Sequence, residues 1–264
     1  MFRIVFHKVF IIHDKLCRQG LFYFNVYGTG TISIIYEDYY KYDKYQKGDL
    51  RMYTGNYECL ELFVKSDEGK KGSVLLKNVK ESTTETKELK HIYGNWIKFP
   101  VSRNTEYEIS TQDCTITFAY LSECENIMEN GICVLDTTDN YKEMNKEEFL
   151  RFIDTPYREQ YHFSPVVNWN NDPNGLCWFK GYYHLFYQLN PFGQEWNNMY
   201  WGHAASKDLM HWTHLPVALE PQEEILDNLA IKGGAFSGSA LPMGDEVYFY
   251  LTRHIGPQDD GWDT

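Results

Sequence analysis

The densest group of residues able to do chemistry in this sequence is the run 169–175, which reads Trp-Asn-Asn-Asp-Pro-Asn-Gly. Taken alone, Asn, Asp, Pro and Gly are the usual residues of a surface turn, and that interpretation stays open. The run begins with Trp169 and is followed at once by a β-type segment, which predicts that Asp172 lies at a strand end beside an aromatic wall. A carboxylate in that position could attack the electron-poor carbon of a sugar that is losing its leaving group.

Other short motifs flank this run along residues 157–252. They are HFSP at 162–165, FYQLNPFG at 186–193, WGHA at 201–204, SKDL at 206–209 with Trp212 close behind, LPVALEP at 215–221 and FSGSA at 236–240. Together with the run 169–175, they resemble glycoside hydrolase family 32, the invertases, inulinases and levanases that hydrolyse β-fructofuranosides. Several motifs in the same order are far more specific than any one of them. The resemblance predicts a hydrolase whose partner is a fructose-containing oligo- or polysaccharide.

The resemblance also implies roles for individual residues. Asp172 matches the family's nucleophile, which retains configuration through a covalent fructosyl-enzyme intermediate. Matches to the fructose pocket are Trp169, Asn171, Gln188, Trp196, Phe236 and Ser237. Their chemistry fits, because amides and hydroxyls hydrogen-bond sugar hydroxyls while aromatic faces cover the sugar's C–H surface. Asn170 stands where the family more often has Met, and the resemblance implies no metal and no organic cofactor.

The family fold is a five-bladed β-propeller, so the resemblance predicts an all-β protein. Five blades of four strands need on the order of 250 residues, whereas residues 156–264 number 109. We therefore expect the first blades of a truncated propeller, in a chain that is the N-terminal portion of a longer enzyme. The family's Arg-Asp-Pro and Glu-Cys motifs, which carry its other two carboxylates, are not found after Asp172, and Glu123-Cys124 precedes it. Because a retaining glycosidase needs two carboxyl groups, we expect the chain alone to be inactive.

Composition divides the chain near residue 155. Of the 7 tryptophans only Trp96 precedes that point, and of the 9 prolines only Pro100 does. Short β-type runs at 21–27, 31–36, 59–64, 73–76, 96–101 and 114–120 predict an N-terminal β-sandwich-like accessory domain over 1–155. A connecting helix at 146–152, capped by Asn145, is expected to end it. Over 156–264, strands are predicted at 176–179, 182–187, 199–206, 236–241 and 247–252, and Lys180-Gly181 fits a hairpin turn.

The overall charge narrows the class of partner. With 25 Lys+Arg against 37 Asp+Glu the net charge is −12, which disfavours nucleic acid and anionic membrane surfaces. No run approaches the roughly 18 apolar residues of a membrane span, and residues 1–12 predict a strand and not a secretion signal. These features favour a cytoplasmic location. The 6 cysteines show no paired spacing, which predicts buried free thiols without a metal site, and the oligomeric state stays open.

Other interpretations remain possible from the sequence. The chain could be a non-catalytic fructan-binding protein that kept the pocket without the acid/base, or a fructosyltransferase in which a sugar hydroxyl replaces water. Clustered tyrosines could offer a sugar platform in the first domain: Tyr36, Tyr39, Tyr40, Tyr42 and Tyr45. His203, His211 and His214 are predicted to be structural, because their spacing does not suit one metal site. Asp208 is predicted to belong to a turn.

Overall fold

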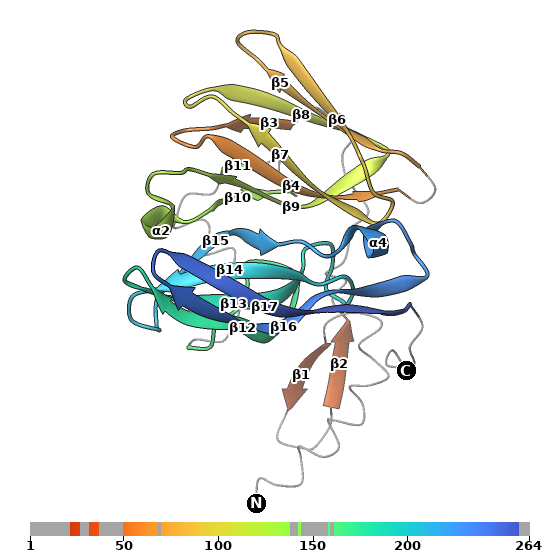
Figure 1. The fold of residues 1–264 in the computed structure, drawn as a ribbon. Coiled ribbons are helices and arrows are strands. Elements are labelled where there is room, and N and C mark those ends of the chain that lie inside the picture. Colours follow the sequence, from red (N-terminus) through yellow and green to blue (C-terminus); the bar gives the residue numbers. More distant parts are fainter. Residues whose placement is uncertain are drawn as a thin grey trace, which may run out of the picture. The chain divides into compact units, whose positions relative to one another are not determined.

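The computed structural model describes residues 22–26, 32–36, 50–67, 70–137, 142–143, 158 and 161–258. The chain has two compact units, Met1–Gln46 and Lys47–Thr264. In the first unit, β1 (Phe22–Val26) and β2 (Ile32–Tyr36) lie where strands were predicted, and they form an antiparallel pair (Figure 1). The predicted strand at 1–12, the helix at 146–152, the boundary at 155 and the tyrosines after residue 36 lie outside the described residues. No helix in the described part is long and apolar enough to cross a membrane.

Two antiparallel sheets form a β-sandwich in the second unit (Figure 1). One sheet has the strand order β11-β10-β9-β4-β7 and the other β3-β8-β5-β6. The bounds are β3 Leu50–Tyr53, β4 Cys59–Ser66, β5 Ser73–Asn78, β6 Thr84–Glu88, β7 Gly94–Pro100, β8 Glu106–Gln112, β9 Cys114–Ser122, β10 Cys133–Asp136 and β11 Lys142–Glu143. Buried side chains from both sheets, such as Leu62 and Ile109, share one core. A single turn of helix, α2 (Ile127–Asn130), joins β9 to β10.

A four-stranded antiparallel sheet follows, with its strands adjacent in chain order. They are β12 (Trp169–Phe179), β13 (Tyr182–Asn190), β14 (Tyr200–Ser206) and β15 (Trp212–Leu219). This meander is what one propeller blade requires. The predicted Lys180-Gly181 turn joins β12 to β13, with φ angles of 45° and 87°. Beyond α4 (Glu223–Leu226), β16 (Ile231–Met243) and β17 (Glu246–Pro257) form a long hairpin, and the predicted all-β class is confirmed.

The run 169–175 is strand, which corrects the expectation that a turn precedes a strand here. Pairing with β13 shifts register between Asn170 and Pro173 and again between Asn174 and Cys177. Each shift marks a β-bulge, which bends a strand and redirects its side chains. Pro173 fits because β12 is the edge strand of its sheet and a bulge precedes it. The Asp-Pro-Asn-Gly segment therefore bends β12 without reversing the chain.

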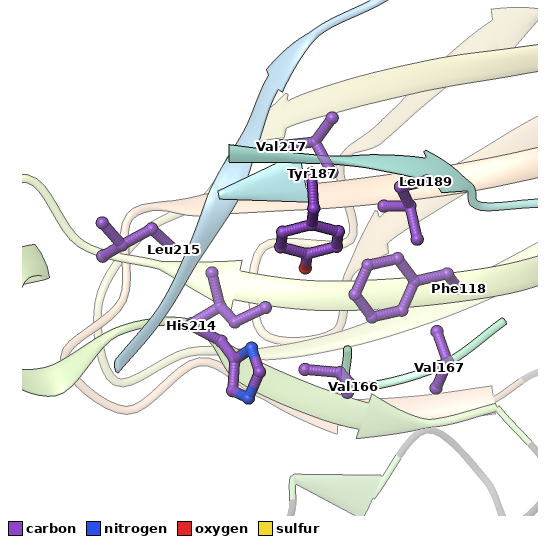
Figure 2. Close-up of a pocket in the computed structure, with 9 residues that line it drawn as sticks. Phe118, Val166, Val167, Tyr187, Leu189, His214, Leu215 and Val217 are labelled. Atoms are coloured by element: carbon purple, nitrogen blue, oxygen red, sulfur yellow. The ribbon is translucent and has the colours of Figure 1, made fainter. Parts of the chain in front are cut away.

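One face of this blade packs against the sandwich. Tyr187 and Leu189 of β13 share a core with Phe63 and Phe118 of the β4 and β9 sheet. Figure 2 shows the small apolar cavity between these layers, which Tyr187, Leu189 and Phe118 help to line. Gln188 lies between Tyr187 and Leu189 in sequence, and side chains alternate along a strand. Its side chain therefore emerges on the opposite face, toward β16.

Candidate active site

Asp172 and three other side chains form a closed ring of hydrogen bonds. Ser237 of β16 donates from Oγ to Oδ2 of Asp172 at 2.5 Å, and Gln188 of β13 donates from Nε2 to that Oγ at 3.3 Å. Asn171 closes the ring, because its Nδ2 donates to Gln188 Oε1 at 2.9 Å and to Asp172 Oδ1 at 3.4 Å. Trp169 braces Asn171 by donating from Nε1 to Oδ1 at 3.0 Å. Both oxygens of the exposed Asp172 carboxylate are thus oriented by donors.

The β12 bulge explains how residues adjacent in sequence converge on one point. The extra residue between the Asn170 and Pro173 pairings leaves Asn171 and Asp172 outside the regular ladder. Gln188, only 2% exposed, faces them from β13. A buried amide needs partners for both its oxygen and its nitrogen, and Gln188 finds them in Asn171 and Ser237. The Gln188 side chain therefore links β12 to β16, and the folding of the blade fixes its position.

Trp201 holds β16 beside the blade. Its fully buried indole donates from Nε1 to the carbonyl oxygens of Ala235 and Phe236, at 3.0 Å and 3.2 Å. The same ring meets Phe249 of β17 edge-on, with 5.8 Å between centroids. These contacts fix the backbone immediately before Ser237, which is why a residue 65 positions away from Asp172 reaches its carboxylate.

An aromatic wall adjoins the ring of hydrogen bonds. Trp196, from the connection between β13 and β14, meets Phe236 edge-on with 6.0 Å between centroids and 78° between planes. His254 of β17 stacks on Phe236 at 4.4 Å, and the Nζ of Lys232 lies 4.6 Å from the Trp196 ring centre. Lys232 and His254 were not predicted from the sequence. The one signal for Lys232 is a charged residue inside the apolar strand run 231–236.

The structure brings all of the predicted site residues together. They form one hydrogen-bonded group and one adjoining aromatic pair: Asp172, Trp169, Asn171, Gln188 and Ser237, and Trp196 with Phe236. Their proximity is a structural finding. The roles implied by the resemblance, nucleophile and sugar ligands, remain predictions.

His184 of β13 and His203 of β14 form a hydrogen-bonded pair next to the bulged segment of β12. Nε2 of His184 is 3.3 Å from the carbonyl oxygen of Phe179, and its Nδ1 is 3.0 Å from Nε2 of His203. A carbonyl only accepts, so Nε2 of His184 carries the proton and Nδ1 accepts from His203. Burial, with a smaller effect from His184, lowers the pKa of His203 to about 3. Phe186 stacks on His203 at 4.2 Å and lies directly against Gly175 of β12.

The predicted structural roles of the other titratable groups hold where the structure describes them. Asp208 accepts from the backbone N–H groups of His211 and Met210, at 2.8 Å and 2.9 Å, which holds its pKa well below the usual range and confirms the turn. Burial lowers the pKa of His214 to about 4 at the wall of the cavity in Figure 2. Glu123 accepts a hydrogen bond from Asn130 of α2.

Metal-binding side chains do not cluster in the described part of the chain. No group of three or more His, Cys, Asp or Glu residues gathers there at a spacing suited to a metal ion. The thiols of Cys59, Cys114 and Cys177 are free and at least partly buried. Cys124 is free and exposed, which differs from the predicted burial.

A carboxylate oriented by a hydroxyl and an amide, beside an aromatic wall on a β-meander blade, is an arrangement suited to carbohydrate chemistry in an all-β protein. Residues 162–262 match the family model described as "Glycosyl hydrolases family 32 N-terminal domain". The resemblance found in the sequence is confirmed, because this part of the chain matches the N-terminal domain of glycosyl hydrolase family 32.

Named relatives and a solved structure agree with this assignment. The chain is 56% identical over 90 residues to the levanase of Bacillus subtilis, covering 34% of this chain and 12% of the levanase. It is 40% identical over 122 residues to a sucrose-6-phosphate hydrolase of Zymomonas mobilis, covering 46% of this chain and 23% of the hydrolase. A glycoside hydrolase family 32 structure from Bifidobacterium adolescentis superposes with a TM-score of 0.72 and 35% identity, over 80% of this chain and 36% of that one.

The extent of these matches differs between sequence and structure. Coverage of 80% exceeds what residues 162–262 supply, so the structural likeness includes part of the sandwich as well as the blade. The matched part of the chain spans 12% of the levanase and 23% of the sucrose-6-phosphate hydrolase. These matches therefore cover too small a part of either relative to establish the activity of the whole protein.

Proposed function

We propose that Asp172 is the nucleophile of a retaining β-fructofuranosidase. The observation that carries the proposal is the closed ring of hydrogen bonds, in which Ser237 and Asn171 each bind one carboxylate oxygen. An exposed carboxylate ordinarily samples several rotamers. Here the two donors restrict it, and a nucleophile held in one orientation lowers the entropic part of the reaction barrier.

The proposed reaction has two steps. A carboxylate oxygen of Asp172 forms a bond to the anomeric carbon of the fructosyl unit, while the bond to the leaving oxygen breaks and that oxygen takes a proton from a general acid. Water then attacks the same carbon and gives a proton back to that acid/base, and Asp172 leaves as a carboxylate. Trp169, Asn171, Gln188 and Ser237 would bind sugar hydroxyls, and Trp196 and Phe236 would cover the apolar face of the ring.

The proposed substrate is a fructose-containing oligo- or polysaccharide. Relatives named levanase, exo-inulinase and sucrose-6-phosphate hydrolase support this class. All three names concern fructosides, which share the fructosyl unit. Transfer to a sugar hydroxyl would use the same first step, with a different acceptor in the second.

We propose further that the 264-residue chain binds fructosides without hydrolysing them. A retaining glycosidase needs a second carboxyl group about 5 Å from the nucleophile, to protonate the leaving oxygen. The sequence after Asp172 contains no Glu-Cys motif of the kind that carries the family's acid/base. Glu123 hydrogen-bonds to Asn130 of α2, in the sandwich.

A substrate whose leaving group needs no proton tests the nucleophile separately from the acid. β-D-Fructofuranosyl fluoride fits, because fluoride departs as an anion. We expect intact-mass spectrometry of the chain to show the addition of one fructosyl group, and peptide mapping to place it on Asp172. Asp172→Asn should abolish the adduct. Asp208→Asn, which changes another exposed aspartate of the same sheet, is the matched control and should label normally.

Three outcomes separate the alternatives. Labelling on Asp172 together with no hydrolysis of sucrose or inulin supports the whole proposal. Hydrolysis of sucrose by the chain, lost in Asp172→Asn, would contradict the need for a further acid while keeping the nucleophile. Binding of inulin without any adduct from the fluoride would favour a fructan-binding protein.

A further inference from the structure

Lys232 is a buried cation next to the candidate site. Its side chain is 1% exposed, and its Nζ lies 4.6 Å from the centre of the Trp196 ring. Burial of an ammonium group is costly unless other groups compensate it, and a cation within about 6 Å of an indole is attracted by the ring's electron-rich face. We propose that Lys232 is a positioning residue, whose ammonium group holds the Trp196 indole in the wall of the site.

The geometry of β16 places Lys232 and Phe236 on the same indole. The two residues belong to one strand, which has a β-bulge between Ala235 and Gly238, and both side chains contact the Trp196 ring. Phe236 meets the Trp196 ring edge-on, while the ammonium of Lys232 lies over its face. Contacts from β16 therefore restrain the Trp196 ring both at its edge and over its face. Trp196 itself belongs to a connection and is only partly buried, so its orientation depends on such contacts.

Gly234 lets the connection approach β16 closely enough for this contact. Gly234 has a φ of 121°, and a Cβ there would lie 2.5 Å from the carbonyl oxygen of Met199. Backbone hydrogen bonds join Met199 N to Gly233 O at 2.7 Å and Ala235 N to Met199 O at 3.0 Å. Asn198, 1% exposed, accepts from Gly233 N at 3.1 Å. The segment that carries Trp196 is thus docked on the glycines that directly follow Lys232.

The inference rests on the proposed function for its effect on sugar binding, whereas the contact itself stands on geometry alone. Without the cation, the indole loses the contact over its face and keeps its edge contact with Phe236. We expect a more mobile indole and weaker binding of the fructosyl unit, by about tenfold, as for the loss of one desolvated cation–π contact. An arginine at position 232 keeps the positive charge and should preserve most of the binding.

The chain offers a matched control in its sandwich. Lys98 Nζ lies 3.8 Å from the centre of the Trp96 ring, and the Lys98 side chain is 52% exposed. Lys98→Met therefore removes the same kind of contact in the sandwich, together with the 3.3 Å ion pair between Lys98 and Glu61. It should leave both the Trp196 signal and sugar binding unchanged.

The experiment combines ¹⁹F NMR of the 5-fluorotryptophan-labelled chain with calorimetric titration of sucrose and inulin. The Trp196 resonance is assigned by its disappearance in Trp196→Phe. We expect Lys232→Met to shift and broaden that resonance, Lys232→Arg to restore a sharp line, and Lys98→Met to move only the Trp96 resonance. In the unmodified protein, the Cε protons of Lys232 should be shifted upfield by the indole ring current, a measurement that needs no lysine variant to fold.

The results test the contact between Lys232 and Trp196 separately from its effect on sugar binding. An unshifted Lys232 side chain, or an unchanged Trp196 resonance in Lys232→Met, would overturn the positioning role. So would a displaced indole that leaves sucrose and inulin binding at the unmodified affinity. If the unmodified chain binds neither sugar but the Trp196 resonance responds as expected, the proposed function fails while the contact between Lys232 and Trp196 is upheld.

Discussion

Ser237 gives the Asp172 carboxylate its shortest hydrogen bond, at 2.5 Å. A hydrogen bond to an ionised group contributes about 1.5–3 kcal/mol, more than a neutral one. We therefore expect Ser237→Ala to slow formation of the fructosyl adduct by about tenfold or more, because the carboxylate loses the donor that aims it. Time-resolved mass spectrometry with β-D-fructofuranosyl fluoride measures this rate.

The strand supplies its own control for that substitution. Ser239 is exposed and lies two positions further along β16. Ser239→Ala should label at the rate of the unmodified chain. Equal rates in both variants would show that Ser237 does not orient the nucleophile.

At the same scale, the sequence predicted residues that belong to ordered motifs and missed those that support them. Asp172, Gln188 and Ser237 each lie in a recognisable short motif, so their meeting could be anticipated without knowledge of the fold. Lys232 could not, because a lysine in a strand is ordinarily exposed. Its burial depends on the approach of the 191–199 connection, which only the folded chain reveals.

The sheet of β12 to β15 carries a pH-sensitive pair, His184 and His203. The pKa of His203 is lowered to about 3, from an unperturbed value of about 6.5. Between these values the unfolded chain binds a proton that the folded chain does not, so the free energy of unfolding falls as the pH is lowered through this window. One such group contributes about 1.4 kcal/mol per pH unit.

Replacing His203 should flatten this dependence. In His203→Gln the amide can still donate to Nδ1 of His184, but it cannot bind a proton. We expect the unfolding free energy of the unmodified chain, relative to that of this variant, to fall by about 1.4 kcal/mol for each unit that the pH is lowered from 6 to 4. Urea unfolding at several pH values measures it. Parallel curves for the two proteins would refute the assignment.

Strands with long runs of aromatic and branched residues were predicted, whereas β3, β6, β8, β10 and β15 were missed, although all of these except β6 bury apolar side chains. β4 and β13 are rich in aromatic and branched residues, and both were expected. β6, Thr84–Glu88, is an edge strand of polar, mostly exposed residues and carries no such pattern. β12 was partly mistaken for a turn because bulges use the same Asn, Asp, Pro and Gly residues that turns use.

In the second unit as a whole, the sandwich and the blade share a core, which the composition of the sequence did not predict. The change in composition near residue 155 separates two segments, yet Phe63 of β4 packs with Tyr200 of β14. The available signal was β4 itself, where residues 60–64 are buried on both faces. A continuous apolar strand of this kind indicates a second covering layer, but not which part of the chain supplies it.

Tyr120 is the polar link between these layers. Its fully buried hydroxyl donates to Glu61 Oε2 at 3.0 Å and accepts from the backbone N–H of Val217 in β15 at 3.1 Å. Tyr120→Phe would leave that buried N–H without its acceptor and remove one donor from a buried carboxylate. We expect a loss of about 2 kcal/mol in unfolding free energy, since unsatisfied buried groups cost about 1–3 kcal/mol each.

Thermal and urea unfolding of the chain measure this loss, with Tyr53→Phe as the control. Tyr53 is 50% exposed, and its hydroxyl donates to Asn104 within the sandwich, at 3.2 Å, so its removal should cost no more than about 0.5 kcal/mol. Because Tyr120 joins the sandwich to the blade that carries Asp172, its loss should also slow labelling by β-D-fructofuranosyl fluoride at temperatures near the transition. Equal stability of the two variants would show that the sandwich does not support the site through this contact.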